Sequence, residues 1–140
     1  MQKIYYLNTD TLPTIPVPHD CDIEDITIED QYIIFKFESD ISYHDSIKHI
    51  NPNAKSLVIK FHLCDEYFNL YKWYKPLKRI AENGFFKCID NSNLPKLTSN
   101  KSFLQYICHY VAYQSIIVEL ADPSPIRLEM SADYVEFYWK

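Results

Sequence analysis

Three of the four cysteines lie beside or within two residues of a histidine. The pairs are His19-Asp20-Cys21, His62-Leu63-Cys64 and Cys108-His109. Thiolate and imidazole are common zinc ligands, and a histidine held near a thiol can activate it as a nucleophile. These pairs are scattered over strand-like segments, whereas structural zinc sites use tight ligand pairs supported by turns. We therefore predict no metal site and no cofactor, and expect packed thiols and hydrogen-bonded imidazoles.

The triplet His19-Asp20-Cys21 has two interpretations. His19 and Cys21 would share one face of a strand, so the imidazole could activate the thiol. The triplet also follows Pro18 directly, which favours a turn that leads into a strand. In that case Asp20 accepts backbone N–H bonds, His19 anchors the turn, and Cys21 packs as a small apolar side chain. We favour this structural interpretation and predict no catalytic residue.

Two further motifs have a structural and a functional interpretation. His44-Asp45 resembles the metal-binding dyad of helical phosphohydrolases, but the chain lacks the further helices and ligands, which favours a helix cap or a loop contact. The segment Tyr71–Arg79 mixes aromatic and basic residues. On such a surface the bases of single-stranded nucleic acid can stack on the aromatic rings, and the basic side chains can neutralise its phosphates. An amphipathic edge strand whose lysines discourage aggregation is the alternative. Because the net charge is −5, we favour the edge strand and expect no nucleic-acid partner.

The negative charge is concentrated in the first half of the chain. Residues 1–70 carry 12 Asp and Glu against 5 Lys and Arg, a net of −7, whereas residues 71–140 carry 7 against 9, a net of +2. Carboxylates fixed on a rigid sheet can steer and hold a basic partner. A solvated hairpin face is the other interpretation. The predicted partner-binding residues are Asp20, Asp22, Glu24, Asp25, Glu29 and Asp30.

Length and composition indicate a single globular domain. A chain of 140 residues is long enough for one hydrophobic core, and we assign residues 1–140 to one domain. Its one glycine, Gly84, excludes the glycine-rich loops of common nucleotide enzymes. The N-terminus lacks the apolar run of a signal peptide, and no segment reaches the length of a membrane span. We expect a soluble, cytoplasmic protein without a membrane partner.

The hydrophobic periodicity predicts a mainly β fold. Twelve tyrosines and 8 phenylalanines suit half-buried strands. Alternating apolar and polar residues predict strands at 3–7, 22–28, 33–38, 57–63, 68–74, 85–89, 103–113, 115–121, 126–130 and 134–139. Turns are expected at 29–31, 65–66 and 122–125, an extended connector at 11–18, short helices at 43–50 and 77–82, and a polar loop before 103. We predict one antiparallel, strongly twisted sheet or partly closed barrel of roughly seven to nine strands with one or two short helices, with an α+β arrangement as the alternative.

Three segments carry a resemblance to known sequences. They are PVPHDCDIEDI, AKSLVIKFHL and SADYVEFYW, and they are spread from Pro16 to Trp139, so the resemblance spans most of the chain. The layout resembles a loose group of uncharacterised small bacterial proteins, chiefly from Gram-positive organisms. These proteins share a His-Asp-Cys lead into an acidic hairpin and a C-terminal Tyr-x-Glu-aromatic-Trp strand. Proteins of this size and kind are often immunity partners of secreted toxins, so the resemblance implies a protein partner and no transferable catalytic residue.

Three functional hypotheses follow from these observations. The first is a non-enzymatic protein-binding module of the immunity or antitoxin kind that neutralises a basic toxin through an acidic surface. The second is a small-ligand-binding β domain. The third is a metal-dependent or cysteine enzyme, for which the sequence offers only the scattered histidine–cysteine pairs.

Overall fold

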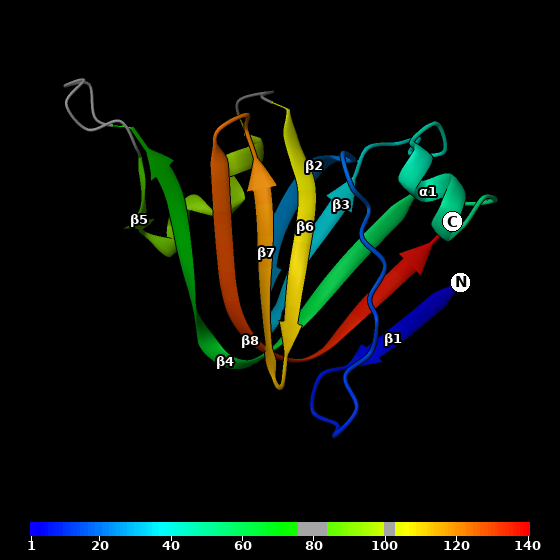
Figure 1. The fold of residues 1–140 in the computed structure, drawn as a ribbon, viewed down its shortest axis with the longest axis horizontal. Coiled ribbons are helices and arrows are strands. Elements are labelled where there is room, and N and C mark those ends of the chain that lie inside the picture. Colours follow the sequence, from blue (N-terminus) through cyan, green and yellow to red (C-terminus); the bar gives the residue numbers. More distant parts are fainter. Residues whose placement is uncertain (76–83, 100–102) are drawn as a thin grey trace.

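The computed structural model describes residues 1–75, 84–99 and 103–140 and shows an antiparallel sheet of eight strands (Figure 1). Of the described residues 57% lie in strands and 10% in helices, which confirms the mainly β prediction. The strands are β1 (Gln2–Tyr6), β2 (Asp22–Glu29), β3 (Tyr32–Phe37), β4 (Leu57–Tyr74), β5 (Phe85–Ile89), β6 (Leu104–Ala112), β7 (Ser115–Ala121) and β8 (Pro125–Trp139). The helical segments are α1 (Asp45–Ile50) and the 3-10 turns η1 (Asn91–Asn93) and η2 (Pro95–Thr98).

Strands β2 and β3 form the predicted acidic hairpin. Most of their alternating apolar residues, among them Ile26, Ile33 and Phe35, are buried, whereas Ile28 near the turn is exposed. The chain reverses at Asp30-Gln31, where Asp30 adopts a φ of 53°, a left-handed conformation that Asp tolerates better than most residues. The period-two pattern therefore identified both strands and their turn.

The strand order is β1-β8-β7-β6-β2-β3-β4-β5, and β4 also pairs with β8. These pairings connect β4, β8, β7, β6, β2 and β3 into a ring, with β1 attached to β8 and β5 attached to β4. Within the described residues, β1 and β5 are the two ends of the order. In Figure 1, β4 and β8 run as long curved strands along the base of the molecule.

Two predicted breaks between strands are absent. Residues 57–63 and 68–74 were expected to form a hairpin around Asp65-Glu66, but they belong to the single strand β4. Residues 126–130 and 134–139 likewise belong to the single strand β8. The β4–β8 register shifts at His62/Leu63 and between Leu63 and Phe68, so the polar residues form an irregularity in a continuing ladder. Neither segment contains the Gly or Pro of a strong turn signal.

The other predicted elements agree with the structure in most cases. Strands β5, β6 and β7 lie within about a residue of their predicted bounds, and residues 12–18 form the expected connector without regular structure. The polar loop before 103 contains η1 and η2, where the Asp90 carboxylate accepts the Ser92 N–H at 2.8 Å. The predicted helix at 77–82 lies outside the described residues.

The buried side chains form one cluster that lines the inner side of the sheet. Phe35 packs edge-on against Phe61 with ring centroids 5.1 Å apart, and the fully buried Tyr106 contacts Phe35 and Phe37. Ile15 of the connector, Ile47 of α1 and Leu94 beside η2 cover this cluster. In the described part of the chain, no helix has the length and apolar character needed to cross a membrane.

Candidate partner-binding site

The His19-Asp20-Cys21 triplet forms a turn against strand β6. The Asp20 N–H donates to the Tyr106 carbonyl at 2.8 Å, and the Tyr106 N–H donates to the Cys21 carbonyl at 3.0 Å. His19 Nδ1 donates to the Ile107 carbonyl at 2.7 Å, so His19 anchors the turn as predicted. The prediction that Asp20 accepts backbone N–H bonds is wrong for the described residues, because Asp20 acts mainly through its own backbone N–H and has a φ of 67°. Its carboxylate lies 3.3 Å from His19 Nε2.

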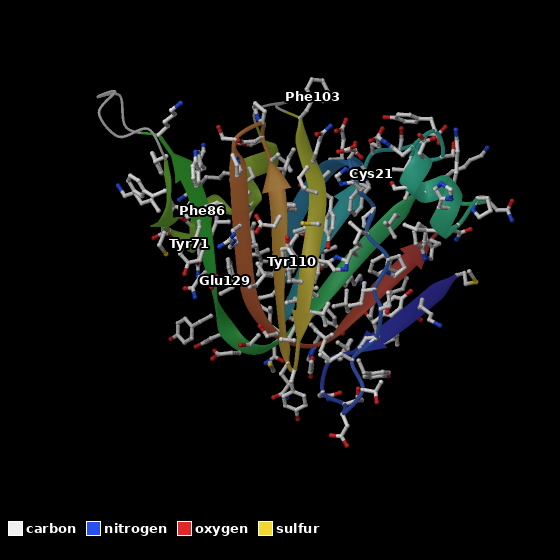
Figure 2. All side chains as sticks on the ribbon, in the orientation of Figure 1. Cys21, Tyr71, Phe86, Phe103, Tyr110 and Glu129 are labelled. Carbon is white, nitrogen blue, oxygen red and sulfur yellow. The ribbon has the colours of Figure 1, made fainter. Side chains whose placement is uncertain are left out.

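Cys21 points into the protein and packs as an apolar side chain. Its relative exposure is 0%, and burial raises the pKa of its thiol to about 12. The carboxylates of Glu38, Asp22 and Asp20 act in the same direction. Because the thiolate is the nucleophilic form, the raised pKa disfavours nucleophilic chemistry at Cys21. Figure 2 shows Cys21 beside the connector, within the fold.

A bulge in β2 determines which carboxylates reach the surface. Ile23 pairs with Phe37 and Asp25 with Lys36, so Glu24 is an extra residue in the ladder. The bulge exposes both Glu24 and Asp25, although strict alternation would place them on opposite faces. Asp22 is only partly exposed, and burial together with the Glu38 carboxylate raises its pKa.

Glu38 lies at the end of β3 and holds this region together. One carboxylate oxygen accepts the Asp22 N–H at 2.9 Å and the His44 Nε2–H at 3.1 Å. The other accepts the Tyr43 hydroxyl at 2.6 Å, and this bond raises the pKa of Tyr43 to about 12. The His44 side chain makes no cap bond to α1, so the loop-contact interpretation of His44-Asp45 is the one that the geometry supports.

These carboxylates line a hollow, which we call the acidic hollow. It has a volume of about 360 Å³, and it is lined by Asp22, Ile23, Glu24, Glu38, Ser39, Thr98, Phe103 and Leu104. Phe103 is 76% exposed and projects at the end of β6 in Figure 2. Among its described lining residues, three are carboxylates and none is a lysine, arginine or histidine. The hollow therefore presents concentrated negative charge beside an exposed aromatic ring.

The six predicted partner-binding residues lie at two ends of β2. Asp20, Asp22, Glu24 and Asp25 lie at or beside the acidic hollow, whereas Glu29 and Asp30 lie at the hairpin turn. Seven residue steps separate Asp22 from Glu29, which corresponds to about 23 Å along a strand. The sequence strip is therefore two separate surfaces. Glu38, Tyr43 and Phe103 were not predicted, because their proximity to β2 depends on pairings between distant segments.

The remaining histidine–cysteine pairs do not converge. His62 Nδ1 donates to the Asp133 carboxylate at 2.6 Å, and the His62 ring stacks on Tyr134 with centroids 4.5 Å apart. His109 Nε2 donates to the Ile15 carbonyl at 2.9 Å, while its Nδ1 accepts the Tyr106 hydroxyl at 2.6 Å. Within the described ranges, no group of three or more His, Cys, Asp and Glu side chains is arranged to hold a metal ion. All four cysteines are free thiols, but only Cys21 is buried, whereas Cys64 and Cys88 are exposed and Cys108 is partly buried. The expectation of packed thiols is therefore correct for Cys21 and wrong for Cys64 and Cys88.

The described part of the Tyr71–Arg79 segment is not an edge strand. Residues 71–74 lie in β4 and pair with β5, and Tyr71 and Lys72 also pair with β8. Lys72 lies 3.8 Å from Asp122, and Trp73 packs edge-on against Phe86. Tyr71, Phe86 and Glu129 are labelled on this part of the sheet in Figure 2. The last two basic residues of this segment, Lys78 and Arg79, lie outside the described residues.

Comparisons with protein-family models, with curated proteins and with solved structures found no match to this chain.

Proposed function

We propose that this protein is a non-enzymatic binding module that takes a basic segment of a protein partner at the acidic hollow. The proposal depends on the negative charge of the acidic hollow. Three carboxylates, Asp22, Glu24 and Glu38, line it, and none of the other described lining residues is a lysine, arginine or histidine. Carboxylates at a partly enclosed surface attract cations more strongly than isolated surface charges do, because the protein wall limits screening.

The carboxylates are held in place before a partner binds. Glu38 accepts bonds from the Asp22 N–H, the Tyr43 hydroxyl and His44 Nε2. These donors fix its orientation, so an incoming lysine or arginine would meet an oriented acceptor and lose less conformational freedom on binding. The raised pKa of Asp22 shows that its negative charge is costly in the free protein. A cation in the hollow would remove that cost.

Exposed aromatic rings flank the charged residues. Phe103 is 76% exposed and Tyr43 is 59% exposed. Aromatic side chains are enriched at the energetic centres of protein interfaces, and a guanidinium group can stack on such a ring while its N–H groups reach a carboxylate. We infer that arginine is the preferred residue of the partner segment.

The partner class that we propose is a basic toxin, which makes the protein an immunity or antitoxin type. Support comes from the small size of the chain, its concentrated acidity and its resemblance to the bacterial group described above. An immunity protein of this kind would cover the basic surface with which the toxin engages its target. Its function would require affinity and shape, and no catalytic residue.

The test is a pair of variants with the same change in net charge. Asp22→Lys with Glu24→Lys reverses two charges at the acidic hollow, and Glu29→Lys with Glu66→Lys reverses two exposed charges elsewhere. The partner captured with the wild-type protein from its own cells is identified, purified and used in stopped-flow binding. We expect the first variant to associate at least about tenfold more slowly at low salt, because opposite charge steers association.

Two outcomes would contradict the proposal. If both variants slow association equally, only net charge matters and the acidic hollow is not the site. If neither does, the partner binds elsewhere. The toxin assignment has its own test, which is whether co-expression of the wild-type protein restores the growth of cells that produce the captured partner. Failure of that rescue with intact binding would remove the immunity role and leave the binding site.

A second hollow favours small-ligand binding as the alternative function. It has a volume of about 340 Å³ and adjoins the first through Glu24, Glu38 and Ser39, with Lys36, Val58 and Tyr138 among its other lining residues. A thermal-shift screen of small anions and metabolites separates the two functions, since a ligand raises the melting temperature by mass action. A protein-binding module would respond only to its partner.

A further inference from the structure

We propose that two copies of this chain associate through the free edge of β1. This strand ends the sheet order, and it pairs with β8 alone. Figure 1 shows β1 at the margin of the sheet, outside β8. The inference is independent of the acidic hollow, which lies where β2 begins and β3 ends.

The hydrogen-bond pattern shows which backbone groups of β1 face outward. Met1 and Trp139 exchange both backbone bonds at 2.8 Å, and the Leu7 N–H donates to the Asp133 carbonyl at 2.8 Å. Residues of odd number therefore point their N–H and C=O groups at β8. The corresponding groups of Gln2, Ile4 and Tyr6 point away and have no backbone partner among the described residues.

A second copy of β1 fits this edge in a self-complementary register. With a twofold axis at Ile4, each Ile4 lies opposite its copy, Gln2 lies opposite Tyr6, and Lys3 lies opposite Tyr5. The outward groups would then form about six backbone hydrogen bonds. A homodimer with twofold symmetry needs a self-complementary surface, because the same patch of each copy contacts the other. If one residue contacts a second residue across the axis, the second must also contact the first. The two sheets would continue into one.

The side chains suit this register. Lys3 Nζ already lies 5.9 Å from the centre of the Tyr5 ring in its own chain, and the second chain would offer an equivalent ring across the axis. No two like charges lie directly opposite one another, whereas β5 paired about its middle residue would place Lys87 against Lys87. Tyr6 is 50% exposed and would be covered.

The face that carries Lys3 and Tyr5 also has room for a second strand's side chains. These two residues border a hollow of about 380 Å³ that also touches Pro16, Ile50 and Trp139. The incoming Lys3 and Tyr5 would project on this same face, because partners in an antiparallel ladder share a side.

Sedimentation equilibrium of the full chain from micromolar to millimolar concentration tests the proposal, with any N-terminal tag removed. We expect a reversible dimer for the wild-type protein. Ile4→Pro removes the central outward donor without breaking a bond to β8, so it should give a monomer. Ile4→Lys places two positive charges opposite each other and should also give a monomer, while Ile4→Thr keeps the donor and a β-branched side chain and should remain a dimer.

A wild-type protein that stays monomeric at millimolar concentration would overturn the proposal. A dimer that persists in both Ile4→Pro and Ile4→Lys would overturn it as well, because the contact would then lie elsewhere. Should Ile4→Pro unfold, Ile4→Lys alone decides between dimer and monomer. Hydrogen exchange gives a second readout, in which the Ile4 amide becomes protected only as the wild-type concentration rises.

Discussion

Both ends of β2 are acidic in sequence, with four carboxylates at the Asp22 end and two at the Glu29-Asp30 end, but they differ in their surroundings. At the Asp22 end, a bulge, the Glu38 carboxylate and the exposed Phe103 ring gather around a hollow. At the Glu29-Asp30 end, the carboxylates lie on a hairpin turn and none belongs to the acidic hollow. The difference shows that a charge run in sequence identifies acidic residues but does not show which of them share a surface.

The Asp22 end is also the one that the core supports. Strand β6 holds the preceding turn through the backbone of Tyr106, whose side chain is fully buried against Phe35 and Phe37. His109 fixes the Tyr106 hydroxyl and also binds the connector at Ile15. A rigid scaffold beneath exposed carboxylates is what a preformed binding site requires.

The largest expected effect comes from removing that scaffold. Tyr106→Ala should lower the free energy of unfolding by about 3–5 kcal/mol, because it leaves a cavity under the turn. Tyr106→Phe keeps the ring and should cost only about 1 kcal/mol for the lost bond to His109. Urea unfolding followed by tryptophan fluorescence measures both. Equal losses in the two variants would mean that the hydroxyl, and not the ring, stabilises this end.

The next prediction concerns the thiol beneath the turn. In the native protein at pH 8, iodoacetamide should modify the exposed Cys64 and Cys88 readily and Cys21 about a thousandfold more slowly, because the Cys21 thiol is buried and its pKa is raised to about 12. Mass spectrometry of the digested protein gives the rate at each position. Rapid native labelling of Cys21 would instead support a reactive site.

A third prediction uses pH to test the His109 contact. Burial lowers the pKa of His109 in the folded protein, so below about pH 6.5 the unfolded chain binds more protons than the folded one. The contribution of neutral, buried His109 to the free energy of unfolding is therefore complete above about pH 6.5. As the pH falls below that value, the free energy of unfolding decreases by at most about 1.4 kcal/mol per pH unit.

Unfolding measured between pH 7 and pH 5 should show a shallower dependence for His109→Gln than for the wild-type protein. Glutamine keeps a donor for Ile15 and an acceptor for Tyr106 but does not titrate. All other residues are the same in both proteins, so the difference between the two pH profiles reports on position 109. Parallel pH profiles would show that His109 is not the group responsible.

The sequence was sufficient for some of these features and insufficient for others. Alternation predicted β2, β3 and β7, because each strand has one buried face. It also separated β4 and β8 into four strands, because a polar break resembles a turn when the pairing partner is unknown. The β4–β8 ladder, which continues past the break, is a contact between distant segments.

The same limit explains the candidate site. Asp22 and Glu24 were identified from local charge density alone. Glu38 joins them only because β3 pairs with β2 in this register, and Phe103 only because β6 pairs with β2 at Asp22 and Ile23. Strict alternation would place Asp25 on the face opposite Glu24, and only the bulge at Glu24, which has no glycine or other local marker, exposes both.

A fourth prediction separates stability from binding at the Asp22 end. Burial and the Glu38 carboxylate raise the Asp22 pKa, so the charged form of Asp22 is less stable in the folded protein than in the unfolded chain. Asp22→Asn should therefore stabilise the protein by up to about half a kcal/mol and slow association with the partner. Urea unfolding and stopped-flow binding measure the two effects. A variant that loses stability and binds normally would assign Asp22 a structural role.

The smallest effect is expected at the other end of β2. Glu29→Gln with Asp30→Asn removes two charges, and asparagine accepts the left-handed backbone of Asp30, which has a φ of 53°. The change in the free energy of unfolding should stay within about half a kcal/mol.

The same variant should associate with the partner at the wild-type rate at physiological salt. Asp22 and Glu29 are about 23 Å apart along the strand, whereas the Debye length at that salt concentration is about 8 Å, so the charges at the turn are screened from the acidic hollow. At 0.01 M salt the Debye length grows to about 30 Å, so a modest slowing should become measurable by stopped flow. If association already slows at physiological salt as much as it does for Asp22→Asn, the partner contacts both ends of β2 and the acidic strip is one interface after all.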